Sequence, residues 1–233
     1  MRKIIPFMIL GLITLLTATG LQSQEKRWKL VTDKNGVQVF TRPVPGSDFD
    51  EFMGVTVMNA RIEELAELLR DIPAVPRWMH NCKEAKILKR ITDNEMILYN
   101  VTDVPWPLDD RYVIVRSTAE KNFQKGRVIV HLDHLADYPY RAPAGYVRMR
   151  SLKAKFIMDF IDRERTKVTY TVKAVPGGSL PASLANIASK ELPYRTLLKM
   201  KKFVKRDKYV LAGKKSKDRS DIENYLNGRH LRK

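Results

Sequence analysis

Residues 146–160 read YVRMRSLKAKFIMDF, and the alternation within this stretch indicates how the chain folds. From position 152 onward the even positions are apolar, whereas Lys153, Lys155 and Asp159 occupy odd positions. Because successive side chains of a strand point to opposite faces, the pattern predicts a strand with one face turned into a core. The inward-facing residues are Leu152, Ala154, Phe156, Met158 and Phe160.

Similar strand patterns precede and follow this stretch. Strands are predicted at 36–44, 49–58, 84–90, 95–102, 111–121, 126–134, 145–160 and 165–175. Short turns join consecutive strands, as in an antiparallel meander. Helical segments are predicted at 59–72, 74–82 and about 182–206, the last with a kink at Pro193. The expected fold class is therefore α+β, a curved antiparallel sheet wrapped around a long C-terminal helix. One helix rarely fills the concavity of so many strands, so an internal apolar cavity is expected.

The N-terminus has the form of a secretory signal peptide. Arg2 and Lys3 precede an apolar run over 4–16, and Ala18 and Gly20 offer an A-x-G cleavage site. The run is short for a membrane-spanning helix, although an uncleaved N-terminal anchor remains the alternative. We therefore expect residues 1–24 to be a signal peptide and the protein to be exported to the periplasm or secreted.

The charge of the chain is strongly basic, at +17 over 233 residues. Residues 199–233 hold 13 Lys or Arg and four Asp or Glu. Such a surface attracts nucleic acid or anionic membrane, and export makes nucleic acid improbable. The tail at 207–233 is expected to be weakly ordered, except for a short helix near 222–226. It either docks on a membrane or is simply solvated.

Several polar residues fall near the expected cavity. Extending the alternation backwards places Arg148 and Arg150 on the inner face, where a guanidinium is costly unless paired. Either one of them meets a polar ligand head group or a cavity carboxylate, or a bulge shifts the register, or both lie at a solvent-exposed strand start. Tyr99 and Asn100 lie in a strand with two apolar faces, so either could supply a polar contact. Cys82, the only cysteine, is expected to be a buried hydrophobe rather than a reactive thiol.

Five pieces of sequence together resemble the START (steroidogenic-acute-regulatory-related lipid-transfer) domains of the helix-grip superfamily, in an exported bacterial form. The pieces, in chain order, are Trp28 to Arg42 with GVQVFTR, VPRWMHNCKEAKIL at 75–88, PWPLDDR at 105–111, GYVRM at 145–149 and PGGSLPASLANIASKELP at 176–193. The resemblance covers about 25–206. It implies a monomeric protein that binds a lipid or a sterol- or isoprenoid-like molecule without covalent chemistry.

The resemblance also implies roles for individual residues. The loop Pro105, Trp106, Pro107 and Leu108 would border the tunnel mouth, or else form a braced turn whose Trp completes the core. Trp78 would pack in the core or line the ligand wall. The final helix would act as a lid with Leu184, Ile187 and Ala188 forming an apolar stripe beneath it. Gly177 and Gly178 would be its hinge, or only a turn.

Residues that would indicate catalysis are sparse. His131 and His134 are three apart in a strand and should face opposite sides, so no metal site is expected, and no nucleotide-binding or nucleophile motif occurs. No cofactor is predicted. A helix-grip cyclase or hydrolase using Arg148, Tyr99 or Asp103 as acid–base groups is the first alternative. An envelope interaction protein with a filled cavity is the second.

Overall fold

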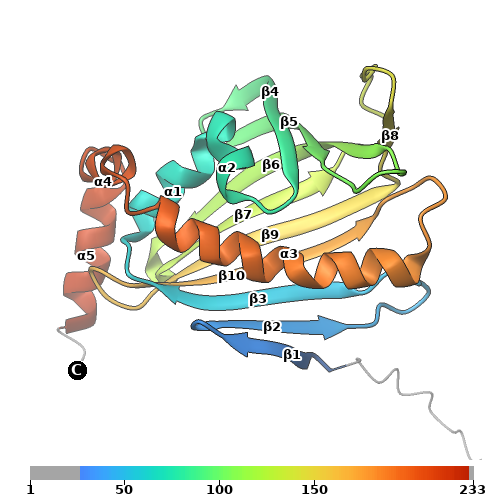
Figure 1. The fold of residues 1–233 in the computed structure, drawn as a ribbon. Coiled ribbons are helices and arrows are strands. Elements are labelled where there is room, and N and C mark those ends of the chain that lie inside the picture. Colours follow the sequence, from blue (N-terminus) through green and yellow to red (C-terminus); the bar gives the residue numbers. More distant parts are fainter. Residues whose placement is uncertain (1–26, 231–233) are drawn as a thin grey trace, which may run out of the picture.

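The computed structural model describes residues 27–230, which form one sheet and the helices packed on it (Figure 1). The ten strands run in the order β1-β2-β3-β10-β9-β7-β6-β5-β4, with β8 attached to β6. Every pairing is antiparallel except that of β6 with β8. The strands are β1 (Lys29–Lys34), β2 (Val37–Arg42), β3 (Glu51–Met58), β4 (Cys82–Thr92), β5 (Glu95–Thr102), β6 (Asp110–Asn122), β7 (Arg127–His134), β8 (Tyr146–Arg148), β9 (Ser151–Phe160) and β10 (Thr166–Val175).

The sheet curves around the longest helix, α3, which crosses its concave side (Figure 1). The helices are α1 (Ile62–Arg70), α2 (Val75–Trp78), α3 (Ala182–Phe203), α4 (Asp207–Lys214) and α5 (Arg219–His230), with single-turn 3-10 helices at Ile72–Ala74 and Phe123–Lys125. The α+β class, the large antiparallel sheet and the long C-terminal helix predicted from the sequence are confirmed. Helix α3 continues through Pro193.

The two faces of the sheet carry separate hydrophobic clusters. We call the face that packs against α1, α2 and α3 the concave face, and the opposite one the convex face. The predicted inward residues Ala154, Phe156, Met158 and Phe160 are buried in the main cluster on the concave face. A second cluster lies on the convex face and consists of Ile97, Tyr99, Val101, Tyr112 and Ile114, covered by residues of the 135–146 segment.

The stretch predicted as one strand at 145–160 is two strands. β8 pairs in parallel with β6, through Tyr112 opposite Arg148, whereas β9 pairs antiparallel with β7 and β10. The alternation therefore breaks between them. Met149 is buried in the main cluster, and Arg150 is exposed. The unbroken pattern placed Arg148 and Arg150 on the inner face of β9. This prediction is wrong, because Arg148 belongs to β8 and Arg150 is exposed.

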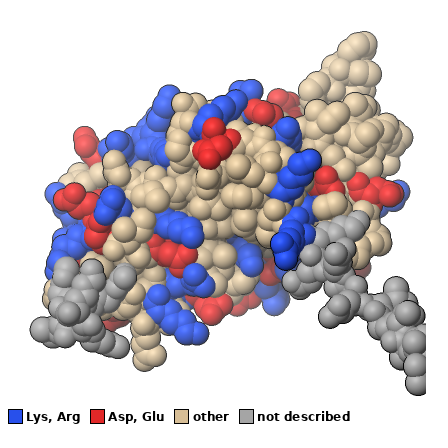
Figure 2. Space-filling model, turned by 90° about the horizontal axis from the view of Figure 1, so that it is seen from below, with Lys and Arg blue, Asp and Glu red and all other residues tan. Residues whose placement is uncertain are grey.

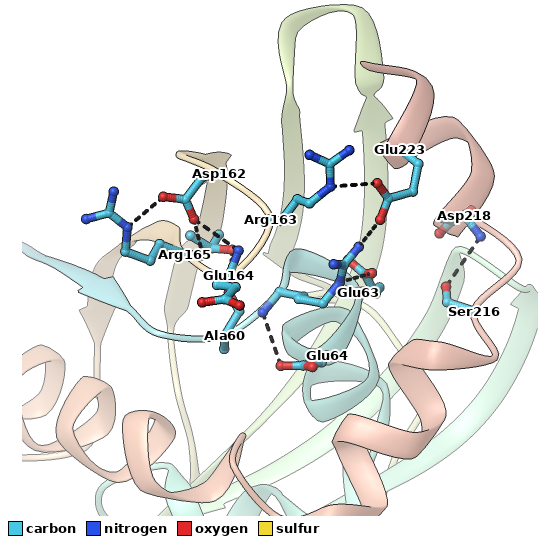
Figure 3. Close-up of polar contacts among 12 residues, drawn as sticks. Ala60, Glu63, Glu64, Asp162, Arg163, Glu164, Arg165, Ser216, Asp218 and Glu223 are labelled. Atoms are coloured by element: carbon cyan, nitrogen blue, oxygen red, sulfur yellow. Dashed lines mark hydrogen bonds and ion pairs between the residues drawn. The ribbon is translucent and has the colours of Figure 1, made fainter. Parts of the chain in front are cut away.

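The C-terminal region is helical rather than weakly ordered. Tyr209 on α4 and Ile222 and Leu226 on α5 are buried in the main cluster. Helix α5 is held by Glu223, which accepts hydrogen bonds from Arg61 at 2.6 Å and from Arg163 at 3.1 Å. Figure 3 shows Glu223 and Arg163 facing each other. Weak order was predicted for 207–233 because the segment is rich in charged residues. Its few apolar residues are spaced along two helices, and they are buried against the main cluster only in the folded molecule.

Candidate ligand site

The concave face beneath α2 and α3 is lined by large apolar side chains. Trp78 of α2 is 1% exposed and meets the ring of Phe156 edge-on, with centroids 6.2 Å apart. Phe156 in turn stacks on Tyr170 at 4.3 Å. Leu152 is half-buried at the end of the same face, and Met158 is fully buried. These side chains fill the space between sheet and helices and form an apolar wall.

A small pocket opens on the concave face at the end covered by α1 and α5. Its volume is about 40 Å³, which is room for a few water molecules and far less than a lipid needs. Of the predicted cavity residues, Met158 lines it, next to Met96 and Glu63. One oxygen of Glu63 accepts a hydrogen bond from Arg61 at 2.6 Å, and the other is buried with no partner.

Polar side chains gather around Val113 on the concave face, near the other end of the sheet. Val113 lies opposite Asn100 of β5. Arg111, two residues before it in β6, shares its face, as does His134, which lies opposite Val115. Buried polar atoms without a hydrogen-bond partner include Asn100 Oδ1, Arg111 Nε and His134 Nε2. The pKa of His134 is lowered by burial and by the charge of Arg148, so the ring is neutral near pH 7.

Arg111 and His134 were not predicted to line the site, whereas Asn100 was. In the sequence Arg111 is the first residue of the predicted strand 111–121, and His134 was assessed only as a metal ligand. Among residues 27–230 no group of three His, Cys, Asp or Glu could hold a metal ion. The signal that could have found Arg111 is its alternation with Val113 and Val115. Tyr112 and Ile114, however, give β6 a second apolar face.

The turn between β10 and α3 lies over Arg111. Gly177 and Gly178 have φ values of 71° and 64°, which favour glycine at both positions. A Cβ on Gly177 would lie 2.7 Å from the carbonyl oxygen of Arg148, and one on Gly178 would lie 3.4 Å from Arg111 Nη2. The two glycines thus let the backbone approach β8 and the guanidinium closely. Whether they also act as a hinge stays a prediction.

Two of the predicted cavity residues lie on the convex face instead. The ring of Tyr99 packs against those of Tyr140, at 4.8 Å, and Tyr112, at 5.8 Å. Arg148 donates to the carbonyl oxygens of Leu135 at 3.1 Å and Tyr138 at 3.0 Å. The face of β5 could not be chosen from sequence because the 135–146 segment buries its convex side as well. Tyr99 and Arg148 therefore stabilise that segment, and they do not line the concave face.

The first half of α3 leaves its predicted stripe in solvent. Leu184 is 54% exposed, Ile187 is 68% exposed and Ala188 is also exposed, whereas Ala185 is buried. The stripe was expected beneath the lid, but the i, i+3, i+4 spacing identifies a common face without showing its direction. Asn186 fixes the rotation of this half, because its side chain bonds the backbone of Asp48 and Asp50, both at 3.0 Å.

The loop at 103–109 presents its tryptophan to solvent. Trp106 is 92% exposed, so it does not complete the core. The flanking Pro105 and Pro107 are exposed too, and Leu108 is half-buried. The loop is held at its base by Asp110, which accepts from the backbone of Val104 at 3.0 Å and from Lys83 at 2.6 Å.

Comparison with known proteins places this geometry in a family. A START domain model matches residues 15–208. The uncharacterized protein PA1579 of Pseudomonas aeruginosa is 35% identical over 171 residues, which are 73% of this chain and 83% of that protein. Phosphatidylcholine transfer protein of Rattus norvegicus is 22% identical over 70% of this chain and 77% of its own length.

Solved structures agree with the sequence matches. A STAR-related lipid transfer protein from Xanthomonas axonopodis is 32% identical with a TM-score of 0.70, covering 77% of this chain and 99% of that one. Human STARD10 is 20% identical with a TM-score of 0.69, covering 88% and 81% respectively, and shows the same fold. Because the family model matches most of the residues, including all of the sheet and α3, the chain belongs to the START domain family.

Proposed function

We propose that the protein binds one lipid molecule between the concave face and α3 and carries it between membranes. The observation that carries the proposal is the concave face itself, an apolar wall under a single long helix with unpartnered polar atoms at one end. An amphipathic molecule matches both parts. Each buried CH₂ of an acyl chain contributes about 0.8 kcal/mol, and the polar atoms orient the head group. Relatives named as lipid transfer proteins support the same role.

Entry of a lipid requires space that side chains occupy in this structure. The two halves of α3 differ in how firmly they are packed. The second half buries Leu197 and Met200 completely, whereas Ala185 is the buried residue among 182–190. Elements with few buried apolar contacts open at the lowest free-energy cost. The first half of α3 therefore moves outward from the β10–α3 turn, and its second half stays docked.

The end of the molecule that carries the first half of α3 would contact the membrane. Trp106, Leu184 and Ile187 are large apolar side chains exposed there. Figure 2 shows Lys and Arg mixed with Asp and Glu over most of one face, and a broad area without charged side chains at the end away from the C-terminus. Tryptophan favours the bilayer interface, so Trp106 would insert first, with basic residues of the chain adding attraction to anionic lipid. Within residues 27–230 no helix is both long and apolar enough to cross a bilayer.

The test has two parts. The first is mass spectrometry of organic extracts from natively purified protein, which should contain one lipid class in stoichiometric amount and chemically unchanged. The second is transfer of fluorescent lipid between vesicles. Trp106→Ala should slow transfer, whereas Leu211→Ala should not, since Leu211 is 54% exposed but lies on α4. Chemical turnover of the extracted molecule would favour an enzyme, and a protein that stays empty in both assays would refute lipid carriage.

A further inference from the structure

Arg111 is a buried cation with fewer partners than its charge requires. It is 3% exposed, and it donates to the backbone carbonyl of Asp109. Its Nε is buried without a partner, and among residues 27–230 it forms no ion pair with a carboxylate. Asp110 lies close enough for the two charges to interact, but its two oxygens already accept from Lys83 and Val104. A guanidinium has five N–H donors, so most of this one remains available.

Burying such a charge is costly unless an anion is placed beside it. Asp110 attracts Arg111 without a direct bond to it and is shared with Lys83, its ion-pair partner at 2.6 Å, so the charge of Arg111 is only partly compensated. The guanidinium also lies under Gly178, at the turn that precedes the movable half of α3. A ligand entering beneath that half would reach Arg111 without crossing the apolar wall.

Asn100 adds a second requirement on the ligand. Thr102 is directly opposite Arg111 and Asn100 is opposite Val113, so Asn100 and Arg111 are diagonal neighbours on one face, roughly 7–8 Å apart. Asn100 Oδ1 is buried and needs a hydrogen-bond donor. A fatty-acid carboxylate or a choline head group supplies none. A phosphate next to a hydroxyl or ammonium group supplies both an anion for Arg111 and a donor for Asn100.

We propose that Arg111 and Asn100 select a glycerophospholipid whose head group carries a hydrogen-bond donor next to its phosphodiester, as in phosphatidylglycerol or phosphatidylethanolamine. The proposal rests on lipid binding at the concave face, the function proposed above. Val113 is buried beside Arg111, and the half-buried Val147 lies opposite it in β8, so the surroundings of the phosphate are apolar and strengthen the charge-assisted bond.

The test compares transfer of fluorescent phosphatidylglycerol, phosphatidylethanolamine, phosphatidylcholine and diacylglycerol from phosphatidylcholine vesicles, in wild type and three variants. Arg111→Gln should slow the two preferred lipids by about tenfold or more and leave diacylglycerol unchanged. Asn100→Leu should abolish the preference over phosphatidylcholine. Arg116→Gln is the matched control, because Arg116 lies in the same strand but is exposed beside Glu95 on the convex face.

The outcomes separate this inference from the function it rests on. If diacylglycerol and phosphatidylcholine move as fast as phosphatidylglycerol in wild type, lipid transfer stands and the head-group assignment is overturned. If no lipid moves, both fail. Inorganic phosphate at millimolar concentration can be added as a competitor of fluorescent phosphatidylglycerol transfer. If it inhibits transfer as strongly as unlabelled phosphatidylglycerol does, the site binds free anions and the assignment is overturned. Urea unfolding should show Arg111→Gln about as stable as wild type, because it removes a buried charge that is only partly compensated. If that variant does not fold, the wild-type preference alone decides.

Discussion

Substitution of Gly54 by Ala tests how tightly the sheet grips α3. Gly54 is buried in β3, between Val39 of β2 and Tyr170 of β10. A Cβ built there would lie 2.7 Å from Leu197 Cδ1 and 2.8 Å from Pro193 Cβ. Both distances are shorter than van der Waals contact, so the helix or the strand must shift.

The structure sets the sign and size of the effect. Strand propensity alone favours Ala over Gly by roughly 0.5–1 kcal/mol. Leu197 is fully buried and Pro193 is rigid, so neither can move away at little cost. Overpacking of this kind typically costs about 1–3 kcal/mol, so we expect Gly54→Ala to destabilise the protein.

Urea unfolding measures the free energy of unfolding of Gly54→Ala, Leu197→Ala and the double variant. Leu197→Ala alone should cost about 2–5 kcal/mol, and the double variant should cost less than the sum because one clash is relieved. Gly228→Ala is the control, since no atom lies within 4 Å of its added Cβ. Gly54→Ala with wild-type stability would refute the close approach of α3 to β3.

Three further predictions concern the ends of the chain and its thiol. A hydrogen bond from Arg61 lowers the pKa of Glu223, and burial opposes this effect only in part. The ionised carboxylate therefore stabilises the docking of α5 at pH values above its ordinary pKa of 4.5. This stabilisation is lost as the pH falls through the lower pKa of the folded state. The protection of the α5 amides, measured as hydrogen exchange relative to the intrinsic rate at each pH, should therefore fall in acid, and Glu223→Gln should remove that pH dependence; equal profiles would contradict it. Burial raises the pKa of Cys82 to about 12, so folded protein should react with maleimide at pH 8 far more slowly than unfolded protein does. N-terminal sequencing of protein from fractionated cells should show a start after Gly20 within the predicted signal peptide, which lies outside the described residues; an intact Met1 would instead favour the uncleaved anchor.

The sequence by itself determined the class of the fold and the inner face of β9. The period of two in 152–160 survives because β9 is buried on one face and polar on the other. The long helix and most of the strands follow in the same way from local pattern and turn residues, whereas β1 was not predicted, β8 and β9 were predicted as one strand, and the pairing of β3 with β10 was not predicted. The five sequence pieces then identified the family before any geometry was known.

Only the tertiary structure decided which polar residues share the concave face. β5 and β6 are apolar on both faces, because the 135–146 segment covers their convex side, so alternation could not assign Tyr99 outward or Arg111 inward. Arg148 was misplaced because β8 pairs with β6, a non-local contact that no local period records. Leu184 and Ile187 share one face of α3 whether that face is buried or exposed, and the hydrogen bonds of Asn186 turn it to solvent. Local periodicity shows which side chains lie together, but what covers each face depends on segments distant in the chain.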